Sequence, residues 1–213
     1  MAEMQQEASS ALNEQTARAL AGVLDTYQRR VVRVPERRLA AVLIPLFERN
    51  DEPWVVLTKR TEQVATHKGQ ISFPGGTQDP EDTDLWDTAI RETEEELGVA
   101  RASIRRVGVL DDYPTFSSGF IVTAFVGELL PPPAWEYSRG EIEHVIELPL
   151  RRLAEEGRVE RWERDGIRFP MSIFEVDGHY VWGVTAFILR RFLDLVGPAL
   201  GLPTPIGDAP IVP

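Results

Sequence analysis

Short apolar runs bounded by polar turns recur along the chain and predict β-strands. The runs lie at residues 39–47, 53–58, 104–110, 120–126, 159–164 and 167–176, with a further strand entry at 141–148. Polar residues 48–52 predict a hairpin between the first two runs, and Asp165-Gly166 is the strongest hairpin signal of the sequence. Residues 111–119 are expected to form a loop that lines a pocket.

Four other segments place apolar side chains at the spacing of an α-helix. Residues 11–29 predict an amphipathic helix that packs on the domain surface or on a partner subunit, which leaves a homodimer open. Residues 149–156 predict a short helix that ends at Gly157, and residues 184–196 predict a largely apolar helix. The fourth segment, at residues 84–97, is strongly acidic.

This mixed order of strands and helices predicts an α/β protein, built as an α/β/α sandwich with a mixed β-sheet. No internal repeat and no linker divides the chain. We therefore expect one main domain at residues 35–200, with an N-terminal helical extension at 1–34 and an irregular Pro-rich tail at 201–213.

The acidic helix has clear sequence signals at both ends. Thr83 or Asp84 is suited to the N-cap and Gly98 to the position after the last turn. At about 100° per residue, one side of this helix is apolar and is expected to be buried. That side carries Leu85, Trp86, Ala89, Ile90, Thr93 and Leu97.

Three carboxylates follow one edge of the predicted buried side. Glu92, Glu95 and Glu96 are related by three and four residues, whereas Glu94 falls at the opposite edge. Judged alone, the run 94–96 would be a solvated face. Its spacing from Arg91 and the double glycine at 75–76 favour a site for Mg²⁺ or Mn²⁺, which prefer oxygen ligands.

The composition limits which metal ligands and which binding partners the protein can have. The chain has 213 residues, a formal charge of −11 and no cysteine, which excludes disulfides and thiolate metal ligands. The negative charge argues against binding to nucleic acid or an anionic membrane. Residues 1–10 lack the pattern of a secretory signal, and no apolar stretch has the length of a membrane span. We expect a cytoplasmic protein that handles a small-molecule nucleotide.

The acidic helix also carries a family resemblance. Residues 91–99, Arg-Glu-Thr-Glu-Glu-Glu-Leu-Gly-Val, resemble the second half of the Nudix box. Leu57-Thr58-Lys59-Arg60 and residues 69–76, Gly-Gln-Ile-Ser-Phe-Pro-Gly-Gly, resemble the additional signature of the coenzyme A pyrophosphatase branch of the Nudix hydrolases. Residues 182–186, Trp-Gly-Val-Thr-Ala, resemble a tail element of the same branch, although Trp182 would serve equally as core.

The sequence departs from the family pattern at two positions. The box has a glutamate eight residues before its arginine, where this chain has Thr83, and the preceding loop is one residue longer. Glu81 or Asp82 is expected to replace that glutamate. The branch signature has an arginine where this chain has Ala65, so hydrolysis of another nucleoside diphosphate derivative, such as ADP-ribose, remains an alternative.

The resemblance implies the Nudix fold and roles for individual residues. Metal binding falls to Glu92, Glu95 and Glu96, and Arg91 would orient them by pairing with Glu95 or with the acidic loop. For the general base, Glu141 is our choice over Glu143, with a solvated strand-entry residue as the alternative. The predicted substrate contacts are Arg60, Lys59, His67, Gly75 and Gly76.

The function implied is a metal-dependent pyrophosphohydrolase. Its expected reaction is cleavage of coenzyme A or acyl-coenzyme A to 3′,5′-ADP and 4′-phosphopantetheine or its acyl form. A nucleotide-binding protein of this fold without turnover is the alternative from another class. The complete set Glu92, Glu95 and Glu96 argues against it, because a pure binder has no need of a metal site.

Overall fold

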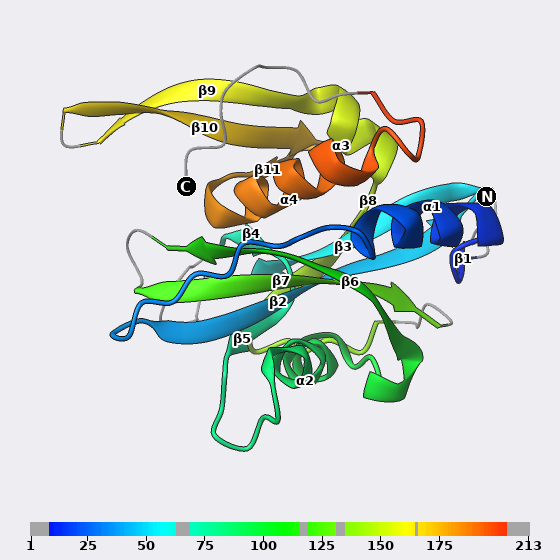
Figure 1. Cartoon of the computed structure of the whole chain (residues 1–213), viewed down its shortest axis with the longest axis horizontal. Coiled ribbons are helices and arrows are strands. Elements are labelled where there is room, and N and C mark those ends of the chain that lie inside the picture. Colours follow the sequence, from blue (N-terminus) through cyan, green and yellow to red (C-terminus); the bar gives the residue numbers. More distant parts are fainter. Residues whose placement is uncertain (1–8, 63–68, 116–118, 131–134, 165, 204–213) are drawn as a thin grey trace.

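A central mixed sheet with helices on both faces forms the body of the protein (Figure 1). The computed structural model describes residues 9–62, 69–115, 119–130, 135–164 and 166–203. Helix α2 (Leu85–Leu97) covers one face, and α1 (Glu14–Leu24) and α4 (Gly183–Val196) lie on the other. This arrangement confirms the predicted α/β/α sandwich.

The central sheet has eight strands, and its main path runs β4-β3-β2-β7-β6. Strands β1 and β5 also pair with β2, and β8 pairs with β3. The pairing of β2 with β7 is parallel and the other pairings are antiparallel, so the sheet is mixed. The strands are β1 (Ser9–Ser10), β2 (Arg38–Arg49), β3 (Glu52–Arg60), β4 (Ile71–Ser72), β5 (Gly75–Thr77), β6 (Ile104–Pro114), β7 (Phe120–Leu129) and β8 (Ile142–Pro149).

Strand β2 shows how the sequence divides the core in two. Successive side chains of a strand point to opposite faces of its sheet. Ile44 and Leu46 belong to the core shared with α1 and α4, whereas Leu43 and Phe47 belong to the core under α2. Because both faces of β2 are covered, its sequence is a continuous apolar run and not an alternating one.

A second, three-stranded sheet lies on the side of α4 (Figure 1). It consists of β9 (Gly157–Arg164), β10 (Ile167–Val176) and β11 (His179–Val181). The hairpin predicted around residues 165–166 joins β9 to β10, and the register of the two strands confirms it. The short helix predicted before Gly157 is α3 (Leu150–Glu156).

The first helix packs on the domain itself. Asn13 caps α1 by accepting a 2.8 Å hydrogen bond from the backbone N–H of Thr16, and Leu20 and Leu24 enter the core. The helix is shorter than the predicted 11–29, because the chain beyond residue 24 leaves the helix and runs along β6. Of the two packing partners that the sequence allowed, the structure shows the domain surface.

Four buried carboxylates of the sheet hold this N-terminal segment, and we call them the N-terminal clamp. Glu128 and Glu48 accept from the backbone N–H groups of residues 12 and 13, both at 3.0 Å. Asp111 and Asp112 accept from those of residues 30 and 32, at 2.7 and 2.9 Å. Between 1% and 8% of each clamp residue is exposed, so these carboxylates bind backbone groups of the protein and not water.

The clamp corrects one sequence expectation. Residues 111–119 were expected to form a loop, but β6 continues through Pro114. Asp111 and Asp112 are buried in the strand because the N-terminal segment supplies donors to them. Asp112 also accepts from Thr123 Oγ1 at 2.6 Å, across to β7. Residues 116–118 of the expected loop lie outside the described residues.

Candidate active site

Helix α2 begins and ends where its sequence predicts. Of the two candidate caps, Asp84 takes the position and accepts from the backbone N–H of Asp87 at 2.8 Å. Gly98 ends the helix in the left-handed conformation, at φ 70°, and its N–H donates to the carbonyl of Glu94 at 2.9 Å. A glycine adopts this conformation without a steric cost, so both ends of the helix are fixed.

The acidic residues of α2 lie on the sides of the helix that the spacing of 100° per residue predicted, with one correction. Glu94 points away from the others and pairs with Arg101 at 3.0 Å. Glu96 is more deeply placed than expected: it was assigned to the edge of the buried side, but only 4% of it is exposed. It lies inside because Arg60 of β3 reaches it, with 3.3 Å between Nη1 and Oε1.

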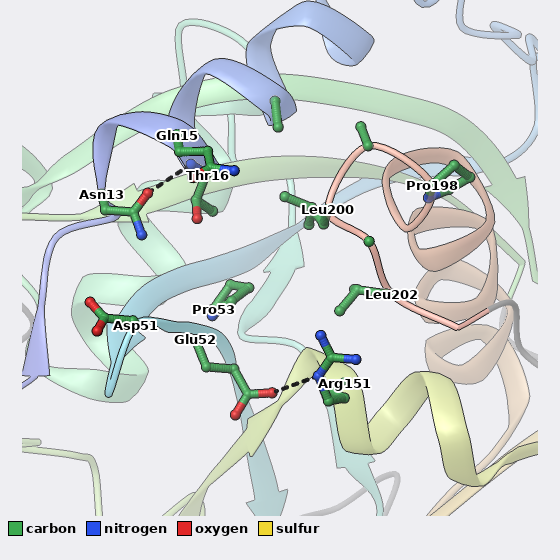
Figure 2. Close-up of a pocket in the computed structure, with 13 residues that line it drawn as sticks. Asn13, Gln15, Thr16, Asp51, Glu52, Pro53, Arg151, Pro198, Leu200 and Leu202 are labelled. Atoms are coloured by element: carbon green, nitrogen blue, oxygen red, sulfur yellow. Dashed lines mark hydrogen bonds and ion pairs between the residues drawn. The ribbon is translucent and has the colours of Figure 1, made fainter.

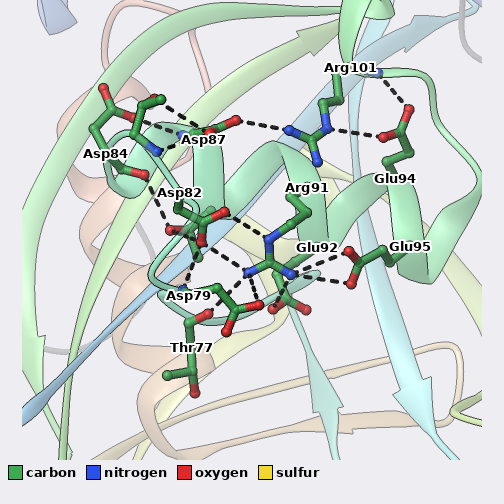
Figure 3. Close-up of polar contacts among 12 residues, drawn as sticks. Thr77, Asp79, Asp82, Asp84, Asp87, Arg91, Glu92, Glu94, Glu95 and Arg101 are labelled. Atoms are coloured by element: carbon green, nitrogen blue, oxygen red, sulfur yellow. Dashed lines mark hydrogen bonds and ion pairs between the residues drawn. The ribbon is translucent and has the colours of Figure 1, made fainter.

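Arg91 connects the helix to the acidic loop that precedes it (Figure 3). Its guanidinium contacts Glu92 at 3.0 Å and Glu95 at 3.2 Å on the helix. It also donates to Asp82 of the loop, from Nε at 2.8 Å, and to the carbonyl of Thr77 at the end of β5, at 3.2 Å. Both predicted pairings of Arg91 are therefore present together.

Asp82, and not Glu81, is the loop acid that meets Arg91. Its carboxylate receives two hydrogen bonds from Arg91 and one from Thr88 Oγ1, at 2.8 Å. These donors hold the pKa of Asp82 well below its usual range, with the Arg91 hydrogen bonds as the largest cause. The sequence left this choice open because both acids lie in the same loop.

Asp82→Asn is expected to lower the free energy of unfolding by about 2 kcal/mol at pH 7, since it removes a charge-assisted pair. Because the pKa of Asp82 is lowered in the folded state, its charge stabilises the fold at pH values above the ordinary aspartate pKa. This stabilisation is lost as the pH falls below that value. The difference between the two proteins in urea denaturation should therefore shrink below about pH 4. Asp79→Asn is the control, because Asp79 is more exposed than Asp82 and its contact with Arg91 is longer, at 3.6 Å. Equal losses in both variants would remove the special role of Asp82.

The glycine pair lets strand β5 lie against β2 and α2. Gly75 has φ 151°, and a Cβ there would lie 2.6 Å from Cα of Val42 on β2. A Cβ on Gly76 would lie 2.5 Å from Cδ of Glu92. Both values are shorter than side chains tolerate, so the glycines bring the backbone up to the Glu92 carboxylate.

Burial disfavours the charged form of the two inner carboxylates. It raises the pKa of Glu96 to about 8, and Arg60 only partly opposes that rise. Burial also raises the pKa of Glu92, again against the effect of its neighbouring arginine, Arg91. Oε2 of Glu96 is buried without a hydrogen-bond partner in the described part of the chain. A cation at this place would satisfy that oxygen and favour both carboxylates.

Comparison with known proteins adds to this geometry. The NUDIX domain model matches residues 36–168. The chain belongs to the Nudix family. Two bacterial proteins, both called "Uncharacterized Nudix hydrolase NudL", are each 35% identical to it. The one from Yersinia enterocolitica aligns over 74% of this chain and 80% of its own, and the one from Salmonella paratyphi B over 76% and 84%.

The fold agrees with that assignment. A MutT/nudix family protein from Enterococcus faecalis superimposes with a TM-score of 0.50 at 14% identity, covering 82% of this chain and 71% of that one. The Nudix chain described here is an enzyme that hydrolyses diphosphate bonds in small molecules derived from nucleotides. Nudix hydrolases generally use divalent metal ions such as Mg²⁺. Within the described residues, no helix is long and apolar enough to cross a membrane.

The residues present fit such an ion in donor type. Glu92 and Glu96 lie one helical turn apart, supply only oxygen, and include the buried oxygen without a partner. The side chain of Glu95 is 58% exposed and is turned to Arg91. Among the described residues no three acidic or histidine side chains are grouped closely enough to hold a metal. Glu92 and Glu96 are thus the two carboxylates that could hold an ion in this arrangement, and Glu95 would have to leave Arg91 to join them.

The other predicted site residues are spread around this helix. Glu141 is exposed immediately before β8, where its charge acts on Glu96. Arg60 contacts Glu96, as described, and Nζ of Lys59 contacts Glu143 at 3.1 Å. His67 lies outside the described residues. The structure thus brings Arg60 into contact with the carboxylates, leaves Glu141 as a charge that acts on Glu96, and directs Lys59 elsewhere.

A cavity of about 640 Å³ lies elsewhere in the fold (Figure 2). It is lined by the start of α1, the turn between β2 and β3, α3 and the segment after α4. Arg151 and Glu52 form an ion pair at its edge, 3.7 Å apart. None of its lining residues belongs to α2, β5 or the loop between them, so it is separate from the carboxylate site.

Proposed function

We propose that this Nudix hydrolase cleaves coenzyme A or acyl-coenzyme A, with Mg²⁺ or Mn²⁺, to 3′,5′-ADP and 4′-phosphopantetheine or its acyl form. The observation that carries the metal-dependent part is the buried carboxylate of Glu96. It has an oxygen without a partner and stands one turn from Glu92. Burying a carboxylate is costly, and Arg60 offsets only part of that cost here, so a fold that keeps this carboxylate has a use for it.

Metal binding falls to Glu92, Glu95 and Glu96 in this proposal. When bound, the ion neutralises charge on the diphosphate and lowers the pKa of an attached water. The chain's own contribution is positioning. Arg91 ties the helix to the loop through Asp82, which holds the carboxylates in place before substrate arrives.

The remaining assignments concern the substrate and the proton. Gly75 and Gly76 are proposed to present the backbone of β5 to the diphosphate beside the Glu92 carboxylate, and Arg60 supplies a positive charge at Glu96. Lys59 and His67 are proposed to contact the substrate beyond the diphosphate. Glu141 is proposed as the general base, because it is exposed immediately before β8 and its charge acts on Glu96.

The substrate assignment rests on the sequence around β3 and β5. Residues 57–60 and 69–76 resemble the coenzyme A branch, and they supply Arg60 and the glycine pair. A second candidate is another nucleoside diphosphate derivative, such as ADP-ribose. Ala65, which stands where the branch signature has arginine, favours this candidate because a cationic substrate contact is missing there.

Incubation with Mg²⁺ and a panel of substrates tests the proposal. We expect 3′,5′-ADP from coenzyme A, identified by mass, and slower turnover of ADP-ribose, NADH and diadenosine polyphosphates. Release of AMP from ADP-ribose with coenzyme A left intact would replace the first candidate by the second. Omission of the metal or addition of EDTA should abolish turnover, and full activity without metal would overturn the role of the carboxylates.

A further inference from the structure

Three nitrogen-bearing side chains meet on strands β3, β8 and β11. Lys59 lies directly opposite His144 in the pairing of β3 with β8. The ring of His144 is 5.7 Å from that of His179, between centroids, with 46° between the ring planes. The charge of Lys59 acts on His179, so the three side chains form one group, which we call the Lys–His cluster.

The cluster and the carboxylate site lie on opposite faces at the same end of β3. Arg60 reaches Glu96 under α2, whereas its neighbour Lys59 contacts residues of β8 on the side of β11. Successive side chains of a strand point to opposite faces, which accounts for this division. A β-bulge after Lys59 shifts the pairing at this end, so that Arg60 pairs with Ile142 and Glu143 is the extra residue.

Glu143 shows which kind of group the cluster receives. A single carboxylate oxygen, Oε1, lies 3.1 Å from Nζ of Lys59 and 3.7 Å from Nδ1 of His144. An anionic oxygen therefore already occupies the space between the two nitrogens. The Glu143 side chain is 44% exposed, so it can turn to solvent when another anion takes its place.

A metal ion is a poorer match for this place. The ammonium of Lys59 repels a cation, and the described residues contain no group of three acidic or histidine side chains able to hold one. A phosphate monoester has several acceptor oxygens and can accept from one ammonium and two imidazolium groups together. The geometry therefore favours an anion with more than one acceptor oxygen.

We propose that Lys59, His144 and His179 form a second anion site, which binds a phosphate monoester of the substrate while the diphosphate lies at α2. This inference rests on the proposed function, in which coenzyme A carries its 3′-phosphate on the same ribose that bears the diphosphate. Arg60 on one face and Lys59 on the other flank the end of β3, so the proposal requires the ligand to pass this end of the strand. The cluster then distinguishes coenzyme A from nucleoside diphosphates without that phosphate.

The electrostatics of His179 agree with this role. Burial lowers the pKa of His179, and the charges of His144 and Lys59 lower it further, while Asp177 opposes them. Glu143 is the other acid of the group, through its contacts with Lys59 and His144. A bound phosphate adds negative charge beside the ring and favours the imidazolium form. Binding should therefore raise the pKa of His179.

The kinetic test compares coenzyme A with 3′-dephospho-coenzyme A in the full-length, Mg²⁺-loaded enzyme. Wild type is expected to prefer coenzyme A in kcat/KM by about tenfold or more, the scale of a charge-assisted contact. A variant with both His144→Asn and His179→Gln should reduce this preference to about twofold, mainly through KM for coenzyme A. Tyr180→Phe is the control, because Tyr180 follows His179 on the same strand and its hydroxyl contacts Glu160 at 3.4 Å.

A binding test separates this site from catalysis. Imidazole NMR resonances of His144 and His179 are followed while metal-free protein is titrated with 3′,5′-ADP, 5′-AMP or inorganic phosphate. We expect 3′,5′-ADP to shift both rings and to raise the pKa of His179, with 5′-AMP at least tenfold weaker. Equal binding of 3′,5′-ADP and 5′-AMP would overturn the site. Equal binding of inorganic phosphate, with no preference for coenzyme A over its dephospho form, would overturn its role toward substrate.

The two tests distinguish the two proposals. If coenzyme A is not cleaved but 3′,5′-ADP shifts the rings as expected, the proposed reaction fails and the anion site stands. If coenzyme A is cleaved and the double variant keeps the full preference, the reaction stands and the anion site fails.

Discussion

Glu96→Gln is expected to lower kcat by at least about a hundredfold. The substitution keeps the shape of the side chain but removes the negative charge that would bind the metal. Loss of several kcal/mol of charge stabilisation in the transition state accounts for an effect of this size. Steady-state turnover of the best substrate at saturating Mg²⁺ measures it, with Mg²⁺ affinity followed by calorimetry. Near-normal kcat would remove Glu96 from the metal site.

Glu94→Gln is the matched control on the same helix. Glu94 points to the opposite edge and pairs with Arg101, and its side chain is 44% exposed. Its activity should stay within about twofold of wild type, since an exposed ion pair contributes little. Glu95→Gln should lose turnover with the fold intact, as Glu96→Gln does, although Glu95 is the most exposed of the three proposed ligands.

Glu96→Gln should lower kcat without lowering the thermal stability of the metal-free protein. Burial raises the pKa of the Glu96 carboxyl to about 8, so its charged form opposes folding when no cation is present. A neutral amide relieves this cost, and metal-free Glu96→Gln should unfold at a temperature no lower than that of wild type. A marked drop in Tm would instead identify Glu96 as a structural partner of Arg60.

Asp112→Ala is expected to lower the free energy of unfolding by about 3 kcal/mol. Asp112 accepts from Val32 N–H, Thr123 Oγ1 and Arg29, and only 4% of it is exposed. The substitution leaves the buried hydroxyl of Thr123 without its acceptor and releases the N-terminal segment, which is why the loss exceeds that of a surface ion pair. Urea denaturation at pH 7 measures it.

Glu155→Ala is the control for that experiment. Glu155 is exposed on α3, so its removal should change the free energy of unfolding by no more than about 0.5 kcal/mol. If Asp112→Ala is as stable as this control, the N-terminal clamp does not hold the segment. Protection of the backbone amide of Val32 from hydrogen exchange should also fall in Asp112→Ala.

Local signals explain what the sequence predicted well. The limits of α2 follow from Asp84 and Gly98, which act through the backbone beside them. The separation of Glu94 from Glu92 and Glu95 follows from the helical repeat alone. Hairpins follow from their turns: Asn50 and Asp51, between β2 and β3, both have positive φ. Features of this kind can be predicted without knowing which distant residues come into contact.

Features that depend on distant contacts were not predictable in the same way. Glu96 can be buried because Arg60, on strand β3, contacts its carboxylate. The spacing of residues along the helix shows only on which side of α2 Glu96 lies. The strand character of Asp111 and Asp112 depends on donors about 80 residues earlier in the chain. The choice of Asp82 over Glu81 was also open, because it depends on how the loop folds against Arg91.

The N-terminal clamp has a consequence for how the protein is made. The segment around helix α1 leaves the ribosome before its acceptors on β6 and β7 are synthesised, and the bond from Leu12 to Glu128 spans 116 residues. The helix must therefore wait until more than half of the chain exists before it can dock. Long-range contacts of this kind form slowly. Docking of the first helix thus reports that β6 and β7 have already assembled.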